Sequence, residues 1–345
     1  MVTLSIVGCA HIHIPGFVKM LLKRQEAGQV QIKHVWDPNP ARAEKRAGEL
    51  PGSKVVKSAS RIWNDPEVRG VVIGSETNLH KKLVMAATMA GKHLFVEKPL
   101  GMGSKDSYAM AAAIKQARVH FTTGYFNRGK PEHLFIKQQV EQGNFGKVTR
   151  VRGSNCHNGS LGGWFDSKPD NPADDWRWMA DPAIAGCGAF GDLGTHLLDI
   201  LMWLMGPVEQ ATAQIDVGTN RYNGTDETGE GLLRFKNGAI GTLAGAWTDV
   251  ANPCTLLVSG TEGHAAVING KLYFTSKRVA GAEGKEPVPA EQMPAALPHQ
   301  FEQFVDAVLG LSSAALVSPD DAAARVSVME AMYLGAAKGK WIKPK

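Results

Sequence analysis

The chain has 345 residues, of which 43% are hydrophobic and 21% are charged. This composition excludes a mainly disordered, collagen-like or coiled-coil protein, and at roughly 150 residues per domain the length indicates two domains. Lys and Arg total 38 against 33 Asp and Glu, and the resulting net charge of +5 forms no long basic run. We therefore expect no nucleic-acid partner, because nucleic-acid-binding proteins usually concentrate their positive charge.

The cysteines and the first residues indicate a cellular compartment. Four dispersed cysteines without a C-x-x-C pair do not form the pattern of a disulfide framework. The first residues lack the basic and apolar regions of a signal peptide, and no window of about 18 residues is apolar throughout. These features predict a cytoplasmic protein with no membrane partner.

Strand-like and helix-like segments alternate over the first 125 residues. Apolar runs such as Val71-Val72-Ile73 are typical of strands buried on both faces. Strand–helix alternation at this spacing predicts parallel βαβ units. The expected strands are 2–7, 30–36, 70–75, 93–97 and 120–124, and the expected helices are 15–26, 40–50, 78–90 and 104–117.

The pattern changes after about residue 130, where strands follow one another without helices between them. Such a succession predicts an antiparallel sheet. A loop rich in Gly, Pro, Asp and Trp occupies 158–188. The expected helices are 131–142, 190–205, 298–309 and 320–337, and the expected strands are 148–154, 209–217, 231–235, 239–247, 255–259, 264–268 and 272–275.

These elements predict an α/β chain of two domains. Residues 1–125 form a Rossmann-type, doubly wound parallel sheet that binds a dinucleotide. Residues 126–345 form an α+β domain with a large, mainly antiparallel sheet, and its C-terminal helices pack back on the chain. One face of that sheet needs cover, so we expect a homodimer or homotetramer formed through it.

The first predicted strand leads into Gly8-Cys9-Ala10-His11-Ile12-His13 and then a helix, which is the position of a dinucleotide fingerprint, G-x-G-x-x-G. Only Gly8 matches. Ala10 stands where the pyrophosphate approaches the backbone, and His13 stands where helix and strand pack closely. An ordinary βα turn explains this signal equally well. His11 and His13 are compatible with phosphate contact, with packing or with a place beside the substrate.

An acidic residue at the end of the second strand strengthens the dinucleotide interpretation. Asp37 occupies the position at which a carboxylate receives the hydroxyls of the adenosine ribose. Because a carboxylate repels a 2′-phosphate, NAD is favoured over NADP. Arg42 is close enough in sequence to keep NADP open, and a turn-forming Asp before Pro38 is the alternative to a cofactor role.

Two further stretches contain residues suited to catalysis. Lys98, in Glu97-Lys98-Pro99, follows a strand at the edge where ligands bind in open α/β sheets. Asp192 and His196 are four residues apart and share one helix face, as a base and its orienting carboxylate would. The alternatives are a solvated loop lysine and, on the helix, a capping Asp with a core His.

Together, the E-K-P sequence at 97–99 and the G-D-L-G-T-H sequence at 191–196 resemble two motifs of the Gfo/Idh/MocA family, the glucose–fructose oxidoreductases, inositol dehydrogenases and their relatives. The segment Thr77-Asn78-Leu79-His80 is similar to the family's T-P-N-x-x-H stretch but lacks its Pro, and 124–128 is similar to the segment that closes the nicotinamide pocket. Trp176-Arg177-Trp178 precedes the glycine-rich helix start, as in several members.

The resemblance implies an NAD-dependent dehydrogenase that transfers hydride between a nicotinamide and a secondary hydroxyl of a sugar, glycoside or cyclitol. In this interpretation Lys98 polarises the reacting oxygen, His196 is the acid/base and Asp192 orients it. The residues expected to contact the cofactor are Gly8, Ala10, His11, Ile12, Asp37, Arg42, Ser75, Thr77, Asn78, His80, Glu97, Lys98, Asn127 and Arg177.

The substrate is the least specified part. Tryptophans offer apolar platforms for the CH face of a sugar ring, and polar loop side chains bind hydroxyls, although loop packing and solvation explain both equally well. The residues expected to contact substrate are Lys98, Tyr125, Asn155, His157, Trp164, Trp176, Asp192 and His196.

Three rival functions are compatible with parts of the pattern. A redox-assisted glycoside hydrolase or epimerase would keep NAD tightly bound, and a sensor would bind NAD and a sugar without catalysis. A metal-dependent hydrolase would use Asp192, His196 and Asp199 as ligands, but it leaves Glu97-Lys98-Pro99 unexplained. We therefore expect no metal.

Overall fold

The computed structural model describes residues 1–311 and 315–345. Contacts within the chain divide it into two compact units. Unit 1 consists of Met1–Gly124, Trp164–Gly186 and His299–Val326, and unit 2 consists of Tyr125–Gly163, Cys187–Pro298 and Ser327–Lys345. The division of the sequence into two domains at residue 125 stays a prediction. By their contacts, two later segments, Trp164–Gly186 and His299–Val326, group with unit 1.

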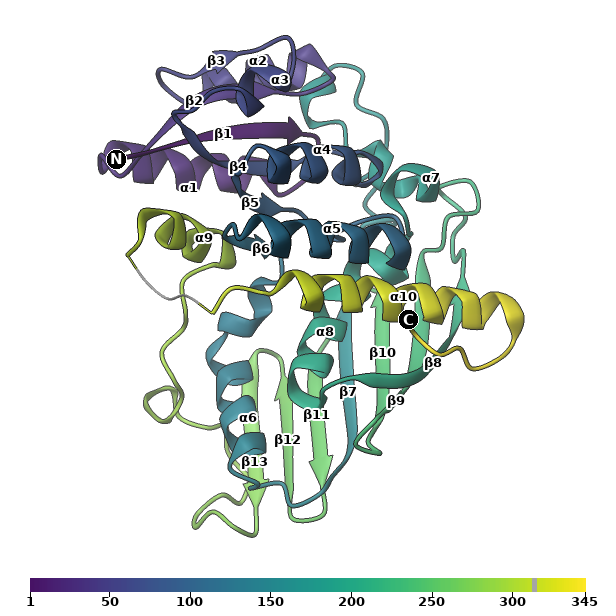
Figure 1. Ribbon diagram of the computed structural model, residues 1–345. Helices are drawn as coiled ribbons and strands as arrows, with labels where there is room; N and C mark the ends of the chain where they lie inside the picture. The colour runs from purple at the N-terminus through teal and green to yellow at the C-terminus, as the bar shows by residue number, and fades with distance from the viewer. Residues whose placement is uncertain (312–314) are drawn as a thin grey trace. The chain divides into compact units, whose positions relative to one another are not determined.

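The sheet of unit 1 has six strands in the order β3-β2-β1-β4-β5-β6 (Figure 1). Every neighbouring pair is parallel, which confirms the predicted doubly wound sheet. Its strands are β1 (Val2–Cys9), β2 (Val30–Trp36), β3 (Lys54–Val55), β4 (Val68–Gly74), β5 (His93–Val96) and β6 (Phe121–Thr123).

Both faces of this sheet are buried. On β4, Val72 packs in one apolar cluster with side chains of the helices α1 and α9. Its neighbours Val71 and Ile73 pack in another with α4 and α5. This alternation is the reason that the strands are apolar throughout. The helices of unit 1 are α1 (Ile14–Glu26), α2 (Pro40–Gly48), α3 (Ser60–Trp63), α4 (Thr77–Met89), α5 (Ser104–Ala117), α7 (Pro182–Ala185) and α9 (Gln300–Leu309).

The sheet of unit 2 has seven strands in the order β13-β12-β11-β7-β10-β9-β8. Its pairs are antiparallel except β7 with β10, which is parallel, so the prediction of a mainly antiparallel sheet is confirmed. The strands are β7 (Val148–Cys156), β8 (Val208–Asp216), β9 (Thr228–Phe235), β10 (Ile240–Ala246), β11 (Cys254–Gly260), β12 (Gly263–Ile268) and β13 (Lys271–Ser276).

Helix α8 (Ala189–Met205) packs along β7, β9 and β10 in unit 2 (Figure 1). Glycines allow this close approach: a Cβ on Gly245 would lie 2.8 Å from the carbonyl oxygen of Phe190. Although α8 is strongly apolar, no helix within 1–311 and 315–345 has the length and hydropathy to cross a membrane. The remaining helices are α6 (Pro131–Glu141) and α10 (Pro319–Lys338).

Candidate active site

The turn that follows β1 is built around Gly8. Its φ is +87°, and a Cβ there would lie 2.4 Å from the Cβ of Ser75, so only glycine fits. The His11 N–H donates to the carbonyl of Gly74, which ties the turn to the end of β4. The Ala10 carbonyl accepts from the Trp178 indole N–H at 3.1 Å. The turn therefore lies at the carboxyl edge of the parallel sheet, directly before the 13-residue helix α1.

Asp37 lies buried at the end of β2 and is held by the backbone. Its carboxylate accepts from the Cys9 N–H at 2.6 Å and from the Asn39 N–H at 2.7 Å. Burial raises the pKa of this carboxyl group, although the two N–H donors act in the opposite direction. The acid predicted for the ribose hydroxyls is therefore fixed beside the turn.

A second carboxylate, which the sequence did not indicate, lies near Asp37. Glu76 accepts from the Arg42 guanidinium at 2.5 Å, whereas Arg42 is 3.7 Å from Asp37. The other oxygen of Glu76, Oε2, is buried and finds no hydrogen-bond partner among the described residues. A buried acceptor of this kind normally has a donor. An adenosine ribose would supply hydroxyl donors at this place, so the residues present fit the cofactor that the fold implies.

The predicted cofactor residues after β4 differ in exposure. Ser75 and Thr77 are buried, whereas Asn78 is exposed. His80 is fully buried, and its ring nitrogens face the carbonyls of Ser75, Pro99 and Leu100. Burial lowers the pKa of His80. These contacts of His80 join the turn after β4 to the turn after β5, and direct contact with the cofactor stays a prediction.

The E-K-P sequence lies at the end of β5, and both of its charged residues are buried: Glu97 is 0% exposed and Lys98 is 3% exposed. The Glu97 carboxylate accepts from the Lys98 N–H at 2.9 Å and from His13 Nδ1 at 3.1 Å. Burial alone would raise the pKa of Glu97, but His11 and His13 hold it well below its usual range. The backbone of Lys98 is therefore held in place at the edge of the sheet where ligands bind in parallel sheets.

The segment Trp164–Gly186 contacts the nucleotide-binding elements within unit 1. Besides the bond from Trp178 to the first turn, Asp174 forms ion pairs with Lys45 and Arg46 of α2. Trp176 packs under the Lys168 ammonium at 4.1 Å, while Trp164 and Arg177 are exposed. Sequence spacing gave no signal for these contacts, because their partners lie far apart along the chain.

In unit 2, α8 presents the predicted catalytic pair in a largely buried setting. Asp192 accepts from the Trp247 indole N–H at 3.2 Å. The His196 ring lies edge-on to Tyr125 and 5.2 Å from the ring of Phe126. The two residues share one helix face as predicted, and orientation of His196 by Asp192 stays a prediction.

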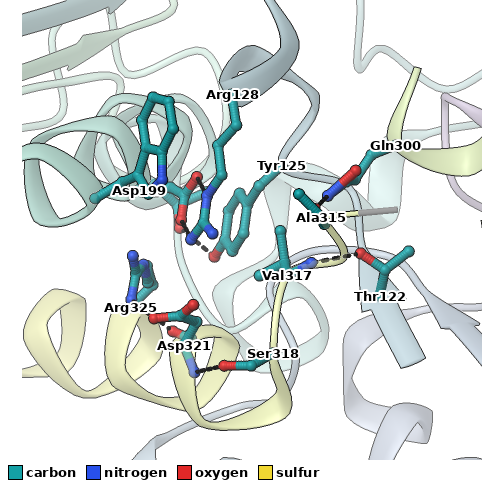
Figure 2. Close-up of polar contacts among 12 residues, drawn as sticks. Thr122, Tyr125, Arg128, Asp199, Gln300, Ala315, Val317, Ser318, Asp321 and Arg325 are labelled. Atoms are coloured by element: carbon teal, nitrogen blue, oxygen red, sulfur yellow. Dashed lines mark hydrogen bonds and ion pairs between the residues drawn. The ribbon is translucent and has the colours of Figure 1, made fainter. Parts of the chain in front are cut away.

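Other side chains of unit 2 fix the surroundings of α8. Tyr125 and Thr195 share a hydrogen bond of 2.9 Å between their hydroxyls. Figure 2 shows the Arg128 guanidinium meeting both oxygens of Asp199, at 2.8 and 2.5 Å. This bidentate pair uses the Asp199 carboxylate, so the third ligand of the rival metal hydrolase is already committed to a cation.

Two of the remaining predicted residues of unit 2, Asn155 and His157, have backbone partners. Asn155 donates from its amide to the carbonyl of Leu193 at 3.1 Å, and His157 Nδ1 accepts from the Gly159 N–H at 2.9 Å. Asn127 is buried, and its Oδ1 has no partner among the described residues.

The predicted site residues divide between the two units. Those in unit 1 are Gly8, Ala10, His11, Ile12, Asp37, Arg42, Ser75, Thr77, Asn78, His80, Glu97, Lys98, Trp164, Trp176 and Arg177. Those in unit 2 are Tyr125, Asn127, Asn155, His157, Asp192 and His196.

A doubly wound parallel sheet with a buried acid at the end of its second strand is the architecture of a dinucleotide-binding domain. Family comparison agrees: residues 2–125 match the model of an oxidoreductase family with an NAD-binding Rossmann fold. Residues 133–266 match the model of the GFO/IDH/MocA C-terminal domain. The chain therefore belongs to the Gfo/Idh/MocA family of oxidoreductases, and its first 125 residues carry the NAD-binding Rossmann fold of that family.

Two curated relatives have names that refer to a sugar derivative and to a cyclitol. A levoglucosan dehydrogenase of Pseudarthrobacter phenanthrenivorans is 28% identical over 255 residues, which cover 67% of this chain and 63% of that protein. A myo-inositol 2-dehydrogenase of Thermotoga maritima is 32% identical over 194 residues, which cover 55% and 53%. The matches thus span less than two thirds of these relatives. A solved levoglucosan dehydrogenase in complex with NADH shares the fold, with a TM-score of 0.80 at 22% identity and coverage of 100% of this chain and 99% of that one.

Proposed function

We propose that this oxidoreductase uses NAD and transfers hydride between the nicotinamide and a secondary hydroxyl of a sugar, glycoside or cyclitol. The observation that carries the proposal is Lys98, a buried lysine directly after β5 at the carboxyl edge of the parallel sheet. The names of the relatives support the substrate class. The preference for NAD is supported by the carboxylates of Asp37 and Glu76, which would repel a 2′-phosphate.

The chain's own residues would bind the cofactor at separate points. The turn at Gly8 and the positive end of the α1 dipole would receive the pyrophosphate, while Asp37 and Glu76 would receive the ribose hydroxyls. When bound, the nicotinamide supplies the hydride acceptor or donor. The further contacts proposed for Ser75, Thr77 and Asn127 follow from the family resemblance.

We assign the catalytic roles from the chemistry of three side chains. Lys98 donates a hydrogen bond to the reacting oxygen and stabilises the negative charge that develops on it. His196 accepts the hydroxyl proton during oxidation and returns it during reduction, for which imidazole is suited near neutral pH. Asp192, already held by Trp247, orients the imidazole or binds a neighbouring hydroxyl. Tyr125, Asn155, His157, Trp164 and Trp176 remain the proposed substrate contacts.

The test follows NADH absorbance with NAD and then NADP against inositols, aldoses and simple glycosides, including levoglucosan. Lys98→Ala and His196→Ala should each lower turnover by roughly 10²- to 10⁴-fold while leaving NAD affinity nearly unchanged. The exposed residues Lys82 and His264 supply the matched controls Lys82→Ala and His264→Ala, which should keep wild-type turnover. Wild-type turnover in Lys98→Ala or His196→Ala would remove that residue from the mechanism.

A redox-assisted glycoside hydrolase or epimerase is the second candidate, and one observation favours it. Trp178 hydrogen-bonds the turn at Ala10, and this contact would slow cofactor exchange if the segment closes over bound NAD. Such an enzyme shows no net NADH but releases NAD when the protein is denatured. Analysis of denatured protein from the same preparation therefore separates the two candidates. A sensor would form no NADH, and it would release NAD on denaturation only if it held NAD tightly without converting any substrate.

We further propose a cytoplasmic homodimer or homotetramer formed through the sheet of unit 2. None of the four cysteines, all of which lie in the described residues, forms a disulfide bond, which suits a reducing compartment. The sheet leaves apolar side chains such as Ile240 exposed, which supports the interface.

A further inference from the structure

His11, His13 and Glu97 form a compact cluster within unit 1. Their potential ligand atoms all lie within 4.8 Å of one another, and no other such group of His, Cys, Asp or Glu occurs in the described parts of the chain. The two histidines come from the turn after β1, and the carboxylate comes from the end of β5. His11 and Glu97 are buried, while the His13 side chain is 32% exposed.

The distances within the cluster suit a small divalent cation. His13 Nδ1 lies 3.1 Å from Glu97 Oε1, and His11 Nε2 lies 3.7 Å from Glu97 Oε2. Zinc binds imidazole nitrogen at about 2.0–2.1 Å and carboxylate oxygen at about 2.0–2.2 Å, so tetrahedral ligands lie about 3.3 Å apart. The three side chains therefore need only small movements to share one ion.

The buried charge of Glu97 gives an independent reason to expect a cation at this cluster. A carboxylate as buried as Glu97 is unfavourable by several kcal/mol unless positive charge or donors compensate it. Lys98 contributes part of this compensation. One dication bound by all three side chains would lie directly beside this carboxylate and neutralise it.

One existing contact opposes metal binding. His11 Nδ1 accepts from the His13 N–H at 3.2 Å, whereas binding through Nε2 places the imidazole proton on Nδ1. This long hydrogen bond must therefore open when the ion binds. A single hydrogen bond of this kind contributes far less to stability than the binding of an ion contributes at a zinc site.

We propose that His11, His13 and Glu97 bind one divalent transition-metal ion of the zinc type. Three protein ligands make an open site, which keeps a position for water or for an oxygen of a bound molecule. The inference departs from the sequence-based expectation of no metal, and it does not depend on the proposed substrate class.

The test uses the full-length protein after treatment with a chelator. Titration with Co²⁺ should give visible ligand-field bands that saturate at one ion per chain, and Zn²⁺ should abolish them by displacement. His13→Asn should weaken Co²⁺ binding at least ~10-fold. His264→Asn changes an exposed histidine that bonds Ser259 and should bind Co²⁺ as the wild type does. Circular dichroism checks that each variant is folded.

One outcome overturns the proposal: the wild-type protein binds no Co²⁺ at one ion per chain and shows no visible bands. If NAD affinity is then unaffected by chelator but weakened in His13→Asn, the two imidazoles are assigned to direct phosphate contact instead.

Discussion

Arg42 lies between the two carboxylates that we assign to the ribose end of the cofactor. Its guanidinium is 2.5 Å from Glu76 and 3.7 Å from Asp37. An arginine at this position usually suggests that a 2′-phosphate is accepted. Here its charge is already paired in a nearly buried environment, so a phosphate would have to displace Glu76.

We expect Glu76→Gln to move cofactor preference toward NADP. The change removes the charge that holds Arg42 and one of two carboxylates that repel a 2′-phosphate. The ratio of kcat/KM for NADP over NAD should rise about 10-fold, which corresponds to about 1.4 kcal/mol. Glu67→Gln, at an exposed carboxylate that pairs with Lys33, is the control. An unchanged ratio in Glu76→Gln would mean that Arg42 is not restrained by this pair.

The sequence predicts only part of this group of residues. Asp37 was predictable because a strand with a clear apolar pattern ends directly before it. Glu76 was not, because a glutamate after an apolar strand has many roles and only folding places it beside Arg42. The cluster of His11, His13 and Glu97 was hidden for the same reason: its members follow different strands of one sheet.

At the scale of elements, the start of α8 is stabilised by distant side chains. The Phe190 N–H donates to the Asp226 carboxylate at 2.9 Å, and the Gly191 N–H donates to the Tyr333 hydroxyl at the same distance. Tyr333 in turn donates to Asp226. A helix-capping role for Asp192 was the alternative to catalysis, and these contacts supply the cap from elsewhere. The apolar periodicity predicted the span of α8, but it carried no information on this cap.

Asp226→Ala should destabilise unit 2 by about 2 kcal/mol, because a helix start loses its acceptor and the buried Tyr333 hydroxyl loses its partner. Urea unfolding measured by tryptophan fluorescence gives the free energy of unfolding. Burial raises the pKa of Asp226, so the ionised carboxylate is costly, and Asp226→Asn should lose less than the alanine variant because it keeps an acceptor.

The control for this measurement is Asp170→Ala, at an exposed loop residue. It should leave the free energy of unfolding within about 0.5 kcal/mol of the wild type. Equal stability of Asp226→Ala and the wild type would show that the start of α8 needs no side-chain acceptor.

At the scale of the whole chain, periodicity predicted nearly every regular element but not which segments form a unit. The strands β1 to β6 and β7 to β13 alternate or run apolar because one or both of their faces are buried. The exceptions are β3, a two-residue strand with exposed side chains, and the short helices α3 and α7. Helix α7 lies within the segment 158–188 that was expected to be a loop. The segment Trp164–Gly186 groups with unit 1 through Trp178 and Asp174, and such contacts leave no local pattern.

The sheet of unit 2 has one face that its own helix does not cover. Gly229 and Gly231 of β9 face Phe190 of α8. The alternating residues of β9 and its neighbour β10 leave Leu232 43% exposed and Ile240 55% exposed. Because strand residues alternate between faces, these two side chains lie on the face away from α8. The same face carries charged side chains such as Arg152 and Glu230, which form an ion pair of 3.8 Å. Exposed apolar side chains beside charged ones suit an association surface with an apolar centre and a polar rim.

Ile240→Glu should therefore convert the proposed dimer or tetramer to a monomer. A carboxylate at this position would lie beside Arg150 and Arg234 of the neighbouring strands, but burying its charge in an interface would still cost desolvation free energy. A stable interface of about 1,600 Å² depends on its apolar centre. Light scattering after size-exclusion chromatography gives the mass of the 37.0 kDa chain and its multiples. Val250→Glu adds the same charge at a residue that is 88% exposed, and it should leave the oligomer intact. A wild-type protein that is monomeric at micromolar concentration, or an Ile240→Glu protein that keeps the wild-type mass, would place any association elsewhere than on this face.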